Sequence, residues 1–130
     1  PIPKLSDHKY KRGICFIIAG EKLIGASKLA CLAASKSALR SGAGLCKLLV
    51  KKEKVSYFTP HILEEIILTY KDNKDLISIL KQENCNTLIY GCGIENNIKN
   101  ERLLVIKAKN KFSFRCYNFF IIKKKKRILF

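Results

Sequence analysis

Residues 25–45 read GASKLACLAASKSALRSGAGL, and this stretch decides the fold. Small side chains recur in it at helical spacing, which predicts a helix that can lie close against a sheet or a ligand. Gly42 suits the left-handed backbone position just past a helix end, so we expect the helix to stop there. Polar side chains gather toward one side of the helix, which we expect to be its solvated face, namely Lys28, Ser35, Lys36 and Arg40.

Two apolar segments flank this predicted helix. Residues 14–19 (ICFIIA) precede it and residues 45–50 (LCKLLV) follow it, and both are typical of buried strands. Glycine-containing turns join the three elements, as in the βαβ crossover of α/β proteins. The sequence therefore predicts an α/β fold class, a layered and mostly parallel sheet with flanking helices.

The middle of the chain carries weaker signals. We interpret residues 51–54 as a charged turn and residues 55–59 (VSYFT) as a short strand or an extended loop. Residues 60–68 (PHILEEIIL) resemble a short helix with Pro60 near its first turn. Adjacent carboxylates point apart on a helix, so the pair at positions 64 and 65 is expected to be solvated rather than catalytic.

The next segments alternate between helical and strand patterns. Residues 72–81 are expected to form an amphipathic helix capped by Asp72. Residues 86–90 (NTLIY) predict a strand, and residues 95–109 predict a further helix.

Composition excludes several classes of protein. Apolar residues make up 48% of the 130, which is too many for a disordered chain. No apolar run reaches the roughly 20 residues of a membrane span, and no secretory signal is visible. The net charge is +16, but residues 101–130 contribute +9 of it. Lysine-rich usage fits an AT-rich genome, so we expect no nucleic-acid partner and no membrane partner.

The six cysteines show no CxxC spacing. Cys15, Cys31 and Cys46 lie inside predicted apolar elements, where cysteine acts as a small hydrophobe. We therefore expect structural thiols, no metal site and a reducing, cytoplasmic location.

Candidate binding residues lie where ligands bind in open α/β sheets, at the carboxyl ends of strands. Gly20, Gly25 and Ala26 stand between the first predicted strand and the helix, whose N-terminus offers free N–H groups to an anion. Gly91 and Gly93 follow the strand at 86–90, and their bare backbone allows close approach to a ligand. Gly20, Gly25 and Gly91 are thus candidates for contact with a phosphate.

Three stretches together resemble one family. HKYKRGICFIIAG at 8–20 is similar to an entry motif His-Lys-Gly-x-x-Gly with its strand, and LIYGCGIE at 88–95 is similar to Ile-Gly-Pro-Gly-Leu-Gly. Residues 25–45 resemble Gly-Ala-Ala-x-Leu-Ala-Ala…Ala-Leu-Arg-Ser-Gly-Ala-Gly-Leu, the most specific of the three. The family is the ADP- or ATP-dependent NAD(P)H-hydrate dehydratase, of the ribokinase-like superfamily.

This resemblance implies a lyase that repairs hydrated NADH or NADPH. In the family a substrate hydroxyl is phosphorylated by ADP or ATP, with Mg²⁺, and phosphate then leaves. By motif position, Ala26 and Gly93 would contact the hydrated nucleotide. Residues 1–111 would be the N-terminal part of the domain.

The family's nucleotide site and catalytic aspartate lie in a Gly-Gly-Thr-Gly-Asp motif, which this sequence does not contain. We therefore assign no catalytic residue and expect neither turnover nor binding of ADP or ATP by this chain alone. A non-catalytic nucleotide-binding fragment is the alternative. A homo-oligomer or an epimerase domain fused upstream would be its protein partner.

The tail at 112–130, FSFRCYNFFIIKKKKRILF, departs from the family's strand Leu-Val-Leu-Asp-Ala. With AT-rich codons for FSFRCY, reading one base later yields that strand. One hypothesis is therefore a frameshifted tail. The other is a functional apolar-basic tail that binds an anionic membrane or a nucleic acid.

Overall fold

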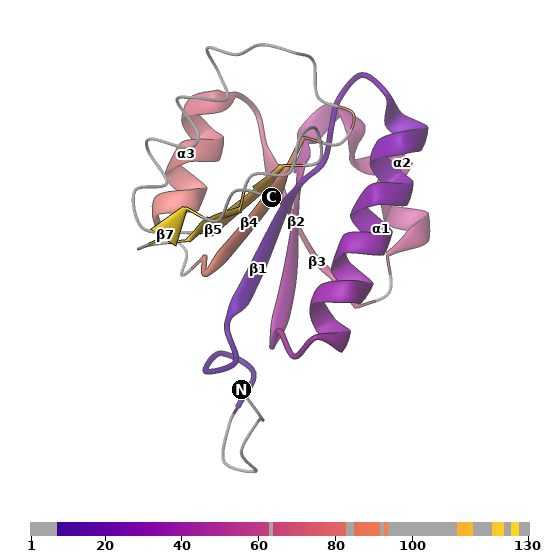
Figure 1. Cartoon of the computed structure of the whole chain (residues 1–130). Helices are drawn as coiled ribbons and strands as arrows, with labels where there is room; N and C mark the ends of the chain where they lie inside the picture. Colours follow the sequence, from indigo (N-terminus) through magenta and orange to yellow (C-terminus); the bar gives the residue numbers. More distant parts are fainter. Residues whose placement is uncertain are drawn as a thin grey trace.

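The computed structural model describes residues 8–62, 64–82, 85–91 and 93, together with the backbone of short strands at 112–115, 121–123 and 126–127. These residues form a sheet with the strand order β3-β2-β1-β4-β5-β6-β7. Figure 1 shows α1 and α2 on one side of the sheet and α3 on the other. The predicted α/β class, with a parallel sheet between flanking helices, is confirmed.

The βαβ unit forms as predicted. Strand β1 (Ile14–Ile18), helix α1 (Ile24–Arg40) and strand β2 (Leu45–Lys51) follow one another, and β1 pairs with β2 in parallel. Gly42 follows the C-cap of α1 with a φ of 106°, the left-handed conformation that ends the helix.

The segment after β2 corrects two predictions. Residues 55–59 form no strand, because a 3₁₀ turn η1 (Lys52–Lys54), a short helix α2 (Val55–Phe58) and a second 3₁₀ turn η2 (Thr59–His61) occupy this region. The predicted helix at 60–68 is also wrong, since strand β3 (Ile66–Tyr70) begins inside it. β3 pairs in parallel with β2. Backbone hydrogen bonds to this neighbouring strand outweigh the weak helical pattern of residues 60–68.

The elements that return to the other side of β1 agree with the sequence. Helix α3 (Asn73–Gln82) starts after Asp72, whose Oδ1 accepts a hydrogen bond from the Asp75 N–H at 2.8 Å. Strand β4 (Thr87–Tyr90) then pairs in parallel with β1. The helix predicted at 95–109 lies outside the described residues.

Three further strands follow β4 in the sheet. β5 (Phe112–Arg115) is parallel to β4, whereas β6 (Ile121–Lys123) and β7 (Lys126–Arg127) are antiparallel additions. The backbone therefore continues as a sheet through part of the segment that the sequence marks as an aberrant tail.

Side chains of β1 alternate between two apolar clusters, as the period of a strand requires. Ile14, Phe16 and Ile18 join the cluster on the α3 side, while Cys15 and Ile17 join the cluster beneath α1 and α2. All of β1 is buried, because helices cover both faces of a central parallel strand. Cys15, Cys31 and Cys46 are buried and form no disulfide, as predicted for structural residues, and Cys85 is buried as well.

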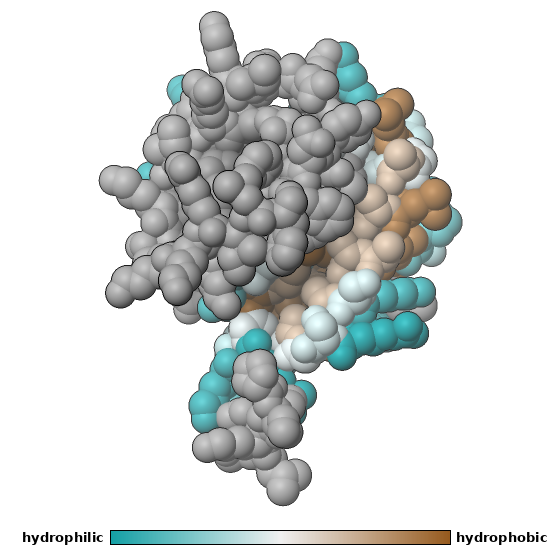
Figure 2. All heavy atoms as spheres, viewed as in Figure 1, coloured by the Kyte–Doolittle hydropathy of each residue, from teal (hydrophilic) through white to brown (hydrophobic). Residues whose placement is uncertain are grey.

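The solvated face predicted for α1 needs correction. Ser35 is only 1% exposed, whereas Leu29 is 73% exposed. Figure 2 shows apolar atoms at the surface over the side of the molecule that carries α1 and α2 in Figure 1. Ser35 turns inward because its hydroxyl hydrogen-bonds to the Glu65 carboxylate and to the Leu32 carbonyl.

The carboxylates at 64 and 65 also differ from expectation. Glu65 is half-buried and receives the Ser35 hydrogen bond, while Glu64 is exposed as predicted. Among the described residues no helix has both the length and the apolar character needed to cross a membrane.

The left-handed turn after α1 yields a matched test. Gly42→Ala should lower the free energy of unfolding by about 1 kcal/mol, because a side chain is strained at this φ. Gly25→Ala should leave stability unchanged or slightly higher, since an added Cβ meets nothing within 4 Å in the first turn of α1. Urea unfolding measures both variants, and equal effects would contradict this account of the helix end.

Candidate functional site

The strand order reverses at β1. The chain runs outward from β1 through β2 to β3, then returns to pair β4 with the opposite edge of β1. α1 and α3 cover opposite faces of the sheet accordingly (Figure 1). In open α/β sheets, the carboxyl ends of the two strands at such a switch point border the usual ligand crevice.

The loop from β1 to α1 lies against the loop that follows β4. The backbone N–H groups of Lys22 and Leu23 donate to the Gly93 carbonyl at 3.2 and 3.5 Å. The Gly20 N–H donates to the Ser27 hydroxyl at 2.7 Å, and Ser27 is completely buried. These contacts fix the loop at the switch point through backbone groups and one serine.

Gly93 permits this contact by its lack of a side chain. Its φ is 73°, and an added Cβ would lie 2.9 Å from the Leu23 carbonyl oxygen and 3.0 Å from Ser27 Cβ. Gly93 therefore allows a close approach between two parts of this chain, while its predicted approach to a ligand stays a prediction. Its observed partner is the β1–α1 loop of the same chain.

The structure brings the sequence-predicted candidates together at this edge. Gly20 is buried and its N–H is engaged by Ser27, whereas Gly25 and Ala26 are exposed in the first turn of α1. Gly91 and Gly93 are half-buried at the end of β4. No side chain caps α1 at Leu23, and no acidic residue occupies its first turn. An anion would therefore be favoured near Gly25 and Ala26.

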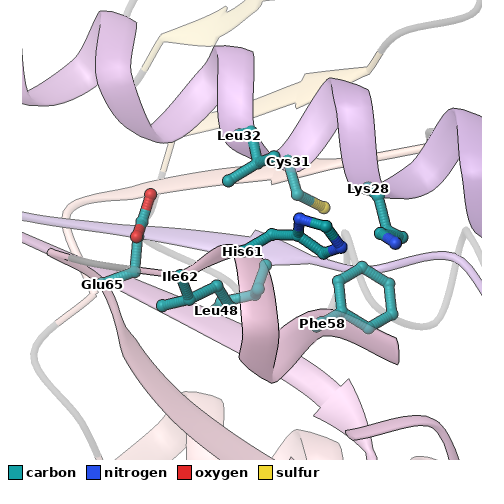
Figure 3. A pocket seen from close by; sticks show the side chains of 8 residues that line it. All are labelled: Lys28, Cys31, Leu32, Leu48, Phe58, His61, Ile62 and Glu65. Atoms are coloured by element: carbon teal, nitrogen blue, oxygen red, sulfur yellow. The ribbon is translucent and has the colours of Figure 1, made fainter. Parts of the chain in front are cut away.

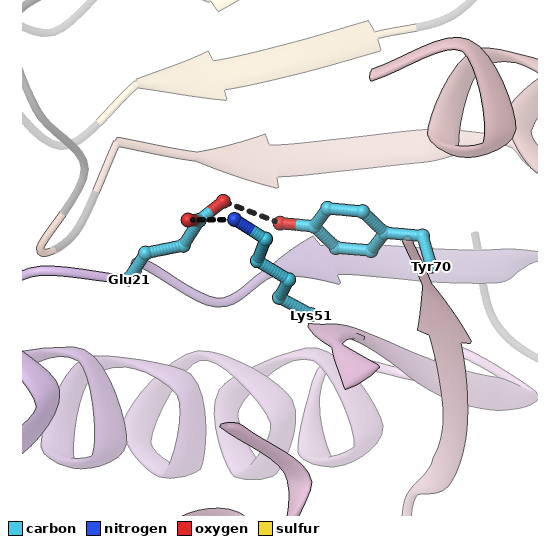
Figure 4. Close-up of polar contacts among 3 residues, drawn as sticks. All are labelled: Glu21, Lys51 and Tyr70. Carbon is cyan, nitrogen blue, oxygen red and sulfur yellow. Dashed lines mark hydrogen bonds and ion pairs between the residues drawn. The ribbon is translucent and has the colours of Figure 1, made fainter. Parts of the chain in front are cut away.

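A charged cluster that the sequence reasoning missed lies along the same edge. Glu21 lies in the β1–α1 loop, three residues past the end of β1, while Lys51 and Tyr70 are the last residues of β2 and β3. Glu21 Oε2 lies 3.0 Å from Lys51 Nζ, and the Tyr70 hydroxyl donates to Glu21 Oε1 at 3.4 Å (Figure 4). The available signal was their common position at strand ends, because parallel strands end at one edge of a sheet.

Electrostatics within this cluster follow from its geometry. The hydrogen bond and the negative charge of Glu21 raise the pKa of Lys51 and keep its ammonium protonated. Burial, and then the Glu21 charge, raise the pKa of Tyr70, so its phenol stays a neutral donor. The cluster is thus a carboxylate held between two donors.

A second feature is a small pocket between α1 and the segment after β2. Figure 3 shows the Cys31 sulfur and the His61 ring pointing toward the same space. Its volume admits about one water molecule. The lining residues are Lys28, Cys31, Leu32, Leu48, Phe58, His61, Ile62 and Glu65.

This pocket lacks an activated nucleophile. Burial raises the pKa of the Cys31 thiol to about 11, opposed by a hydrogen bond with Ser27 and reinforced by Glu65. A thiol of this pKa is protonated near neutral pH and reacts slowly. Within the described part of the chain, no three His, Cys, Asp or Glu side chains are grouped to hold a metal ion.

Comparisons with known proteins identify the fold. A ribokinase-like superfamily protein from Enterococcus faecalis V583 superposes with a TM-score of 0.66 at 13% identity, covering 87% of this chain and 39% of that protein. A hypothetical protein from Streptococcus mutans superposes with a TM-score of 0.58 at 21% identity, covering 83% of this chain and 37% of that protein. The fold of this chain is thus similar to part of these two structures, and the chain spans about two fifths of their length.

Sequence comparisons add no closer assignment. No protein-family model matches the chain, and no curated protein matches it.

The buried serine of the loop contact is open to direct test. Ser27→Ala should reduce the free energy of unfolding by about 1–3 kcal/mol, because the buried Gly20 N–H loses its acceptor. Ser37→Ala is the control, since Ser37 is exposed on the same helix and the substitution raises helix propensity by the same amount. Chemical denaturation compares the two variants, and equal stabilities would contradict a structural role for the Ser27 hydroxyl.

Burial of Cys31 predicts a loss of stability in alkali. The unfolded chain releases this proton near pH 9, whereas the folded chain retains it to about pH 11. The contribution of Cys31 to the free energy of unfolding is therefore complete below pH 9 and declines as the pH rises toward 11. At pH 10 the loss is about 1 kcal/mol. Cys31→Ala should flatten the decline between pH 8 and pH 10 in urea unfolding. An unchanged slope would show that other groups cause the decline.

Proposed function

We propose that this chain is the substrate-binding part of a domain that repairs nicotinamide nucleotides by dehydrating hydrated NADH or NADPH at the expense of ADP or ATP. Its ribokinase-like fold supports a kinase-like domain in general. The resemblance of residues 25–45 to the dehydratase motif supports the specific reaction.

One observation carries the proposal. The loop that joins the first two motifs meets Gly93 of the third at the switch point of the sheet, although about seventy residues separate them in the chain. Their contact exists only because Gly93 has no side chain and Ser27 has a small one. A shared constraint of this kind explains why both motifs would occur in one sequence.

We assign the contacts with substrate to the exposed side of this junction. Gly25 and Ala26 begin α1 without a capping side chain, so their N–H groups suit a phosphate of the nucleotide. Ala26 and Gly93 would face the hydrated nicotinamide, as the resemblance implies. Gly20 would act indirectly, because its N–H already donates to Ser27.

We assign no site for the nucleoside di- or triphosphate or its Mg²⁺ to the described residues. The described residues contain no cluster of metal-binding side chains, and the sequence contains no Gly-Gly-Thr-Gly-Asp motif. We therefore derive no phosphoryl-transfer step from this chain and expect no turnover from it alone.

Titration with NADPH and hydrated NADPH, followed by amide NMR shifts, tests the binding role. We expect weak saturable binding, with a Kd of about 1 mM, and shifts concentrated at residues 20–27 and 93. Ala26→Leu should abolish these shifts by filling the exposed first turn of α1. Ala33→Leu is the matched control, because Ala33 is exposed farther along the same helix.

Two results would overturn this proposal. One is the absence of any shift up to several times this concentration, and the other is equal binding by the two variants. Binding of NADPH with Ala26 dependence but without preference for the hydrated form would instead favour a non-catalytic nucleotide-binding module.

The tail hypothesis has a separate test in the nucleotide sequence across codons 105–130 and beyond. We expect a second reading frame that encodes Leu-Val-Leu-Asp-Ala at FSFRCY and continues into Gly-Gly-Thr-Gly-Asp. If no frame does so, the tail is native. Co-sedimentation with liposomes or DNA, with and without residues 112–130, then becomes the relevant measurement.

A further inference from the structure

The cluster of Glu21, Lys51 and Tyr70 borders the proposed binding edge but belongs to none of the three motifs. Lys51 and Tyr70 end β2 and β3, and Glu21 lies in the β1–α1 loop beside Lys22 and Leu23, which hydrogen-bond to Gly93. A ligand at the switch point would therefore lie beside this cluster. Figure 4 shows the Lys51 ammonium and the Tyr70 hydroxyl both directed at the Glu21 carboxylate.

Solvent reaches both members of the ion pair. The Lys51 side chain is 29% exposed and the Glu21 side chain is 43% exposed. Pairs of this exposure contribute little to folding stability. An incoming anion can therefore replace the carboxylate as the partner of the ammonium.

The carboxylate keeps a partner after such an exchange. Tyr70 is 4% exposed and donates its hydroxyl to the other oxygen of Glu21. Glu21 would thus remain hydrogen-bonded while Lys51 turns to a new anion. Because both anions carry negative charge, Glu21 would also oppose the binding that Lys51 favours.

We propose that Lys51 is an anion-binding residue of this edge, that Glu21 is its resident counter-ion, and that the incoming anion is a phosphate group of a small-molecule ligand. A lysine ammonium binds phosphate as a compact charge with three donors. The uncapped N-terminus of α1, without acidic residues in its first turn, adds favourable potential on the same edge. The proposal deepens the proposed function and rests on it only for the identity of the whole ligand.

The proposal predicts that substitutions of Glu21 and Lys51, the two members of the ion pair, change anion affinity in opposite directions. Pyrophosphate is the probe, titrated at constant ionic strength and pH 7 and followed by amide shifts. Glu21→Gln should tighten pyrophosphate binding by about threefold, and Lys51→Met should weaken it by about threefold, the scale of an exposed charge interaction. Lys51→Arg should retain binding, since it keeps the charge.

Lys52→Met is the matched control. Lys52 is exposed and adjoins Lys51 in sequence, but it begins η1 instead of ending β2. Its substitution by Met removes the same net charge as Lys51→Met. Its effect on binding should be clearly smaller than that of Lys51→Met. Circular dichroism confirms that each variant is folded before titration.

The proposal is overturned if Lys51→Met and Lys52→Met behave alike, or if Glu21→Gln weakens binding as Lys51→Met does. A purely structural ion pair gives the latter result. Parallel titration of the same variants with NADPH separates this proposal from the function. Lys51-dependent pyrophosphate binding without NADPH binding supports the anion site and opposes the repair function. NADPH binding that is unchanged by Lys51→Met supports the repair function and opposes the anion site.

Discussion

The close approach of two backbone loops at Gly93 is the constraint on which the rest of this edge depends. The Gly93 carbonyl accepts from two N–H groups of the β1–α1 loop, and the absence of a Cβ leaves room for Leu23 and Ser27. Because this loop is held from one side by Gly93, in the segment after β4, and from within by Ser27, α1 starts at a defined point above the sheet. The exposed residues of its first turn are therefore presented at the switch point.

The same constraint explains the use of small residues along α1. Ser27 and Cys31 are buried against the sheet, one and two turns into the helix, and Ser35 continues that line. Side chains of this size allow the helix to approach β1 and β2 closely. Their polar atoms are satisfied locally, as when Ser35 donates to Leu32 and Glu65. The helix thus buries a row of small polar side chains whose hydroxyls are hydrogen-bonded, and leaves Leu29 in solvent.

The charges at the candidate site do not follow the basic composition of the chain as a whole. The described carboxyl edge carries a carboxylate with two donors on it, while the strongest cluster of basic residues lies in residues 101–130. Net charge therefore says little about the candidate site. What matters there is the local balance between Glu21, Lys51 and the start of α1.

The sequence alone determined the β1–α1–β2 unit, the stop at Gly42, the cap at Asp72 and the return strand β4, because each depends on contacts between near neighbours or on a clear hydrophobic period. It also brought the glycines at 20, 25, 91 and 93 and Ala26 to one edge, since parallel strands end together. Only the tertiary structure decided β3, because IILTY fits a helix or a strand until β2 offers it hydrogen bonds. Likewise only the fold brought Glu21, Lys51 and Tyr70 together. Their contact depends on the order of strands in the sheet, which no local pattern encodes.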